Sequence, residues 1–186
     1  VDFICHGVPS PLVFDKYKLK LETINGAKVK NFNFRNKENG WKSFNVKVTF
    51  DNGNMFSEPF NHNTYMKGFL RNLYLRSSCY NCTSNNFTSG SDITIGDFWG
   101  VQDLKPDFDD DKGCSLFFVN TLKGKEIYKI IKKDFDIENI NYSSILKYNK
   151  SIYRPAFKNK NRLKFFDNFQ EKDIIENIEE NLYDEV

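Results

Sequence analysis

The stretch that decides the fold runs from Ser43 to Phe50 and reads SFNVKVTF. Apolar and polar residues alternate along it, which is typical of a strand with one buried face. The sequence Asp51-Asn52-Gly53-Asn54 then predicts a turn, so residues 55–58 should pair back on the strand as a hairpin. Alternation also precedes the stretch, at Val29, Phe32 and Phe34. We therefore expect an antiparallel sheet built around residues 44–50.

Helices are expected on either side of this hairpin in the sequence. The first should run over residues 11–24, with Ser10 as N-cap and Pro11 at the first helical position, and end at Asn25-Gly26. Its inward face is predicted to hold Leu12, Val13, Tyr17, Leu21 and Ile24. The spacing of apolar residues predicts further helices over residues 63–75, 124–135, 162–169 and 172–182.

Other strands are expected outside the hairpin. Residues 1–5 (VDFIC) are typical of the end of a buried strand, and residues 92–96 (DITIG) predict a short one. The continuous apolar run at 115–121 (SLFFVNT) favours a central strand, and residues 136–141 an edge strand. Because strands and helices interleave irregularly, the fold class is predicted to be α+β, a mixed, largely antiparallel sheet with flanking helices. One domain is expected over residues 1–170, followed by a C-terminal helix over 171–186.

The composition excludes several classes of protein. The chain has 186 residues, 39% of them hydrophobic, with 19 Phe, 9 Tyr and 2 Trp, so it can bury a core and is not disordered as a whole. A net charge of only +2 argues against a dedicated nucleic-acid binder. No stretch reaches the ~18 apolar residues that a membrane-spanning helix needs. Neither nucleic acid nor a membrane is therefore expected as a partner.

The ends and the sequons bear on the context of the chain. It opens on Val1 without a methionine or a leader, so we expect an excised piece whose true N-terminus lies upstream. Four Asn-x-Ser/Thr sequons occur, at Asn81, Asn86, Asn141 and Asn149. Composition alone predicts about two by chance, so they are weak evidence for secretion. A cytoplasmic location is expected.

The cysteines carry the strongest chemical signal. Cys79-x-x-Cys82 has the spacing that lets two sulfurs reach one zinc ion or one iron-sulfur cluster. A disulfide is a third explanation, but it requires an oxidising compartment. A zinc site would need His6 and His62, although neither histidine has a partner at useful spacing. A cubane cluster needs four thiolates, and Cys5 at a strand-to-turn corner is well placed to be the third.

The fourth cysteine, Cys114, has a different setting. It stands at the head of an apolar strand in the sequence GCSLFF, where a cysteine commonly serves as a small buried hydrophobe. We interpret it in this way. The fourth thiolate of a cluster would be either Cys114 or a residue upstream of the chain. Our interpretation of Cys114 favours the upstream residue.

Several strings in this sequence occur together and in a fixed order. They are DFICHGVPS (2–10), FRNK (34–37) with Gly40-Trp41, SCYNC (78–82), SDITIGDFWG (91–100) and KGCSL (112–116). In this combination the chain resembles the C-terminal domain of the coenzyme F420 hydrogenase/dehydrogenase beta-subunit family. The resemblance runs from residue 1 to about 166, since Arg154-Pro155 and residues 162–166 are similar to the family's final segment.

This resemblance implies an iron-sulfur and flavin electron-transfer module of an oxidoreductase. By position, Cys5, Cys79 and Cys82 match the family's cysteines and would ligate a [4Fe-4S] cluster, with the fourth ligand upstream. The implied cofactors are this cluster, FAD and, as a further candidate, coenzyme F420. The implied partner is a redox protein or an upstream ferredoxin-like domain. For bacterial members without the deazaflavin, the resemblance also implies an association with polysaccharide biosynthesis loci. No catalytic residue is assigned.

Two groups of residues are candidates to bind a flavin. Arg35 and Lys37 could hold its pyrophosphate or the acidic tail of a deazaflavin. The ring edge or the ribityl hydroxyls would fall to residues around a short strand: Asp92, Thr94, Asp97 and Trp99. Structural explanations stay open for both groups. The first could be a solvated hairpin with a packing Trp, and the second a loop held by buried aspartates and a core Trp.

Two competing functions also stay open. One is a non-enzymatic interaction domain in which the CxxC loop holds a structural zinc or no metal at all. The other is a domain associated with a glycosyl- or pyruvyl-transferase, which would bind a nucleotide sugar without the loop cysteines.

Overall fold

The structure is a computed structural model that describes residues 1–182, and these residues fold as two compact units. The first unit consists of residues 1–6 and 81–156, and the second of residues 7–80 with the chain from 157 on. Within the described residues, no helix is long and apolar enough to cross a membrane. The α+β prediction is confirmed, because each unit combines one small sheet with helices.

The sheet of the second unit is the predicted hairpin with one more strand. It consists of β2 (Val29–Asn36), β3 (Asn45–Phe50) and β4 (Met55–Pro59), in the order β2-β3-β4 and antiparallel throughout. Central strand β3 buries every second side chain, as the alternating sequence predicts. Val48 pairs with Phe32 on one side and with Phe56 on the other.

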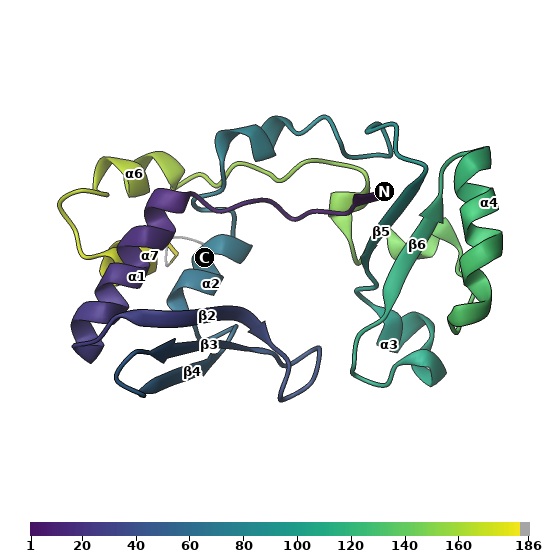
Figure 1. Ribbon diagram of the computed structural model, residues 1–186. Helices are drawn as coiled ribbons and strands as arrows, with labels where there is room; N and C mark the ends of the chain where they lie inside the picture. Colours follow the sequence, from purple (N-terminus) through teal and green to yellow (C-terminus); the bar gives the residue numbers. More distant parts are fainter. Residues whose placement is uncertain (183–186) are drawn as a thin grey trace. The chain divides into compact units, whose positions relative to one another are not determined.

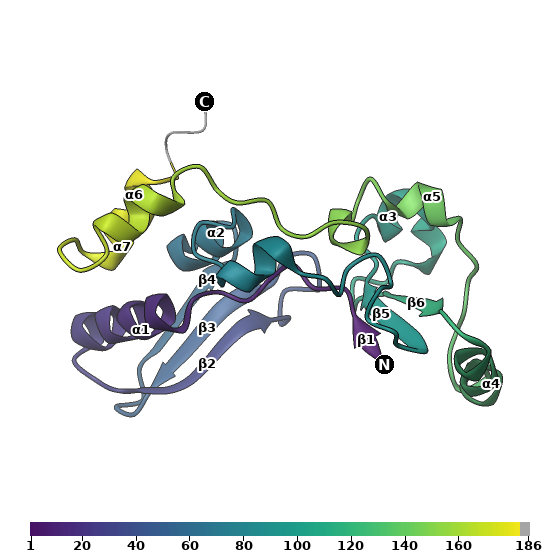
Figure 2. The same ribbon diagram turned by 90° about the horizontal axis from the view of Figure 1, so that it is seen from above.

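Helices cover one face of this sheet. They are α1 (Pro11–Asn25), α2 (Thr64–Leu70), α6 (Arg162–Asp167) and α7 (Ile174–Glu180), and both ribbon views place them over the same face (Figures 1 and 2). The core between the two layers is apolar and rich in aromatic rings. Its fully buried side chains include Val13, Val46, Val48, Leu73, Tyr74, Phe165 and Ile178.

Two of the predicted helices differ from the sequence-based expectation. In α1, Val13, Tyr17 and Leu21 are buried and Phe14 packs beside them, but Leu12 and Ile24 are 67% and 61% exposed, because they lie off the face that meets the core. The predicted helix 63–75 ends at Leu70, and Asn72 adopts a positive φ of 60°. The chain therefore leaves the helix in a turn at residues 71–74 and enters the core there.

The sheet of the first unit has the order β1-β5-β6. Its strands are β1 (Asp2–Phe3), β5 (Ile93–Asp97) and β6 (Ser115–Val119), with β1 parallel and β6 antiparallel to β5. The remaining helices of the unit are α3 (Val101–Leu104), α4 (Leu122–Ile131) and α5 (Tyr142–Ile145). Single 3-10 turns occur in the chain at Ser77–Asn81, Pro106–Phe108, Lys132–Asp134 and Lys150–Ile152.

Three expectations for this unit were wrong. Strand β6 lies at an edge rather than in the centre, and its Phe117 and Val119 are about two-fifths exposed. Phe3 in β1 is 65% exposed, so this strand is not buried. Residues 136–141 form no strand and lead into α5 instead. An apolar run shows that a strand is present but not which neighbours it has, because strand order depends on contacts distant in sequence.

The expected division at residue 170 stays a prediction. Helix α7 falls within the segment 171–186 that was expected to be a C-terminal helix, and residues 183–186 of that segment lie outside the described part of the chain.

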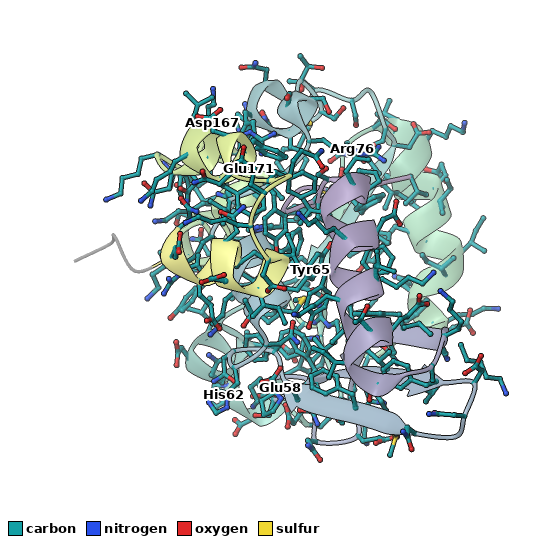
Figure 3. The ribbon with its side chains drawn as sticks, turned by 90° about the vertical axis from the view of Figure 1, so that its left-hand side faces the viewer. Glu58, His62, Tyr65, Arg76, Asp167 and Glu171 are labelled. Carbon is teal, nitrogen blue, oxygen red and sulfur yellow. The ribbon has the colours of Figure 1, made fainter. Side chains whose placement is uncertain are left out.

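Tyr65 is the notable polar group of the second unit's core. Its side chain is 1% exposed and its ring stacks on Tyr17 with centroids 5.0 Å apart. Within the described residues, no group forms a hydrogen bond with the Tyr65 hydroxyl, whereas the neighbouring Tyr74 hydroxyl donates to the Tyr65 carbonyl. Figure 3 shows Tyr65 toward the middle of the unit, with Glu58 of β4 and the nearby His62 below it in the view. Burial raises the pKa of the Tyr65 phenol far above its usual value.

Replacing this phenol tests the packing directly. We expect Tyr65→Phe to raise the free energy of unfolding by about 1 kcal/mol, because it removes a buried hydroxyl that makes no hydrogen bond. The matched variant Tyr74→Phe should lower the free energy of unfolding by about 1 kcal/mol, because it removes a hydroxyl that donates a hydrogen bond to the Tyr65 carbonyl. Urea denaturation of both variants measures the difference, and equal losses from both would contradict this description of the core.

Candidate functional site

The predicted ligand Cys79 lies on a tight 3-10 turn, Ser77–Asn81, in the second unit. The amide of Cys79 donates to the Arg76 carbonyl over 3.0 Å, which closes the turn. The amide of Val8 donates to the Cys79 sulfur over 3.3 Å. The Cys79 thiol in turn donates to the Val8 carbonyl over 3.9 Å, so both backbone polar groups of Val8 contact this cysteine.

The Val8 amide is held in place by a short two-stranded contact. Pro9 and Leu75 form an isolated antiparallel bridge. On its two sides, the Ser10 amide donates to the Tyr74 carbonyl and the Arg76 amide to the Val8 carbonyl, each over 2.8 Å. The segment that precedes α1 is thus fixed against the segment that leads to Cys79.

Gly7 makes this close approach feasible. Its φ is +146°, and a Cβ placed there would lie 2.7 Å from a methyl carbon of Leu75, which is itself fully buried. A side chain at this position would push the 7–10 segment away from Leu75. The close approach to Leu75 therefore explains the glycine of the HGVP string, and the sequence alone did not predict this contact.

The other two predicted ligands, Cys5 and Cys82, belong to the first unit and are exposed. The Cys82 carbonyl accepts a hydrogen bond from the Asn85 side chain over 2.7 Å, which holds the backbone that follows the CxxC pair. All four cysteines of the chain are thiols rather than disulfides.

Cys114 differs from the other three in its surroundings. Its thiol donates to the Phe108 carbonyl over 3.4 Å, and its own carbonyl accepts from the Phe98 amide over 2.9 Å. It is half-buried at the start of β6. The sequence predicted a small buried hydrophobe, whereas the thiol is half-buried and donates a hydrogen bond within its own unit.

The donor chemistry fits an iron-sulfur cluster only in part. Three exposed or half-exposed thiols are of the right type, and one has an amide donor at its sulfur. Over residues 1–182, however, no three His, Cys, Asp or Glu side chains come together as a group that could hold a metal ion. The assignment of Cys5, Cys79 and Cys82 as ligands thus stays a prediction.

The six flavin candidates are divided between the units. Arg35 and Lys37 belong to the second unit, whereas Asp92, Thr94, Asp97 and Trp99 belong to the first. The guanidinium of Arg35 lies 5.7 Å from the ring of Trp41 and 5.2 Å from that of Phe44, both buried. Lys37 is exposed just beyond the end of β2. Trp41 therefore packs in this hairpin, in line with the structural explanation that was left open for Arg35 and Lys37.

Asp92 and Thr94 take part in hydrogen bonds of their own unit. The Thr121 hydroxyl donates to the Asp92 carboxylate over 2.5 Å and accepts from the Gly124 amide over 3.1 Å, so this pair fixes the start of α4. The buried Thr94 hydroxyl accepts from the Asn120 side chain over 2.8 Å. Both contacts agree with a loop held by its own polar side chains.

The last two flavin candidates, Asp97 and Trp99, come next in the sequence. Asp97 ends β5 and pairs with Ser115 in the ladder, and Trp99 is half-buried two residues later. The amide of the intervening Phe98 donates to the Cys114 carbonyl, as described above. The structure places all four residues of this group within one strand and its two ends, but it assigns none of them a ligand.

The pH dependence of stability tests whether Asp92 is a structural residue or a flavin ligand. The Thr121 hydroxyl, followed by Lys123 at 3.5 Å, holds the pKa of this carboxyl below its ordinary 3.8. The ionised form therefore stabilises the fold at neutral pH, and this contribution is lost as the pH falls through the lowered pKa. We expect Asp92→Asn to be less stable than wild type at pH 7 and equally stable in strong acid. Unfolding measured against pH checks this.

The control for this variant is Asp107→Asn, since Asp107 is exposed in another turn of the same unit. It should leave stability unchanged at both pH values. If Asp92→Asn also left stability unchanged while flavin binding fell, Asp92 would be a ligand and not a structural residue.

Two groups beside Cys79 were not predicted from the sequence. The Val8 amide is a backbone group, so no side-chain pattern indicates it. No role was assigned to Tyr80, which lies between the loop cysteines. HGVP and the CxxC pair are some seventy residues apart, so no local pattern links these segments.

Comparison with known proteins identifies the family of the chain. The family model that matches the chain describes the C terminus of the beta subunit of coenzyme F420 hydrogenase/dehydrogenase, and the match covers residues 1–144. This range contains the four cysteines and all six flavin candidates. No curated protein and no solved structure shows a significant match to the chain.

Proposed function

The chain belongs to the family of C-terminal domains of the coenzyme F420 hydrogenase/dehydrogenase beta subunit, and from this premise we propose that it is an electron-transfer module of an oxidoreductase. The proposed cofactors are a [4Fe-4S] cluster and FAD, with coenzyme F420 as a further candidate. A cluster supplies one-electron transfer and a flavin couples it to a two-electron hydride step. The protein's own part is to hold these groups and set their charge environment.

The observation that supports the proposal most is the amide of Val8 at the Cys79 sulfur. Reduction adds negative charge to a cluster and its thiolates, and amide donors at the sulfurs stabilise that charge and raise the potential. A bond of 3.3 Å from a backbone that is itself fixed on both sides would do so without reorganisation. A thiol that served only as packing would have no need of such a donor.

The proposed ligands are Cys5, Cys79 and Cys82, with a fourth thiolate from outside this sequence. For the flavin, Arg35 and Lys37 are proposed to meet the pyrophosphate, since both are cationic and Arg35 is oriented by two rings. Asp92, Thr94, Asp97 and Trp99 are proposed for the ring edge and the ribityl hydroxyls. A redox protein or a ferredoxin-like domain is the proposed partner, the cytoplasm the proposed location, and polysaccharide biosynthesis a proposed context.

Single cysteine variants of the full-length protein test the ligand assignment. We expect Cys79→Ser and Cys82→Ser each to abolish cluster assembly, because a cubane cluster needs all of its thiolates. Cys114→Val should retain the cluster, since its thiol bonds within its own unit. Iron and acid-labile sulfide per chain, measured after purification without oxygen, report the outcome.

The same measurement separates the competing functions. Equal loss of iron in all three variants would make Cys114 the fourth ligand and overturn the assignment. Zinc at unit stoichiometry would favour the interaction domain with a structural metal. Nucleotide-sugar binding that survives both loop-cysteine variants would favour a transferase-associated domain.

A further inference from the structure

The turn that carries Cys79 is connected to a part of the chain some eighty residues away. Tyr80, the residue after Cys79, donates its hydroxyl to the Asn72 carbonyl over 2.9 Å. The same hydroxyl accepts a hydrogen bond from the Arg162 guanidinium over 3.1 Å. Arg162 is the first residue of α6, so a helix that is distant in the sequence reaches the turn of Cys79. All of these groups belong to the second unit.

The Arg162 guanidinium has three further contacts that orient it. Its Nη1 also donates to the Leu73 carbonyl over 3.3 Å. Its central carbon lies 5.1 Å from the Tyr80 ring and 4.6 Å from the Phe166 ring. A planar cation fixed between two rings and two oxygen acceptors has few alternative rotamers, so it can hold Tyr80 in one orientation.

These bonds satisfy consecutive carbonyl groups of one turn. The carbonyls of Arg71, Asn72 and Leu73 accept from the side chains of Asn159, Tyr80 and Arg162, respectively. The turn needs this support because Asn72 has a positive φ and both Asn72 and Leu73 are buried, away from water. The segment that leads on to Cys79 therefore starts from a backbone that side chains of residues 159–162 and Tyr80 hold in place.

We propose that Arg162 and Tyr80 are positioning residues that hold the turn of Cys79 so that its sulfur faces the Val8 amide. Tyr80 is bonded to the turn at residues 72–73, and that turn continues into the 74–76 segment that fixes Val8. Loss of the phenol hydroxyl or of the guanidinium fork removes the side-chain hydrogen bonds that tie Tyr80 to residues 72–73, and leaves the turn of Cys79 without this support. As an aid to cluster binding, this role rests on the proposed function.

The test measures the accessibility of single thiols in the full-length protein. The metal-free, reduced protein is treated with iodoacetamide over a range of pH, and mass spectrometry follows each cysteine separately. The plateau rate at high pH reports exposure, whereas the midpoint reports the thiol pKa, so the two effects are not confused. Tyr80→Phe and Arg162→Lys both keep the local charge and remove a hydrogen-bonding group.

We expect the plateau rate of Cys79 to rise about tenfold in each variant, because the loss of one such hydrogen bond shifts local opening by about this factor. The double variant should be no faster than the faster single one, because both residues act through the same bond. Cys114, in the other unit, serves as the internal reference and should keep its rate. Arg71→Lys is the matched control, since Arg71 donates to the Leu182 carbonyl rather than to Tyr80.

Two results would overturn the inference. One is an unchanged Cys79 rate in both variants. The other is an equal rise of the Cys79 and Cys114 rates in both Arg162→Lys and Tyr80→Phe, which would mean general unfolding. Additive effects in the double variant would contradict the joint action of the pair.

Iron and sulfide content of the same variants links the inference to function. If wild type assembles a cluster, both variants should retain less of it than Arg71→Lys does. If wild type assembles none, the proposed function fails, whereas the Cys79 rates still decide whether Arg162 and Tyr80 position the turn.

Discussion

Much of the second unit depends on one backbone turn, at residues 71–73, whose buried carbonyl groups are satisfied by side chains. Without those hydrogen bonds, the positive φ of Asn72 would combine strain with unpaired polar groups in a dry core. With them, α2 can stop at Leu70 and the chain can pass straight into the core through Leu73, Tyr74 and Leu75, all fully buried. The same passage then reaches the turn that carries Cys79.

This passage explains why a tight cysteine-bearing turn can be built next to an aromatic core. Burial of residues 73–75 fixes the start of the turn, and the bridge between Pro9 and Leu75 brings the Val8 amide to the sulfur. Gly7 permits the approach because a side chain there would meet Leu75. Packing, backbone pairing and thiol chemistry are thus linked through a few neighbouring residues.

Local patterns predicted the elements better than their arrangement. The alternation around Val46 and Val48 identified β3 and its hairpin, and the Ser10-Pro11 start identified α1, because both signals lie within a few residues. The run at 115–121 was correctly a strand but was placed in the centre of a sheet, since neighbouring strands come from distant parts of the chain. The spacing of Cys79 and Cys82 predicted metal chemistry, whereas the contacts of Arg162 with Tyr80 could not be seen, because they join segments eighty residues apart.

The central claim is that these thiols serve a redox cluster, and electron paramagnetic resonance tests it most directly. The full-length protein would be purified without oxygen and examined before and after reduction with dithionite. We expect no signal from the oxidised [4Fe-4S] cluster and, on reduction, a paramagnetic signal together with bleaching of the visible absorbance. A protein that stays silent and colourless in both states while holding one zinc ion per chain would contradict the claim.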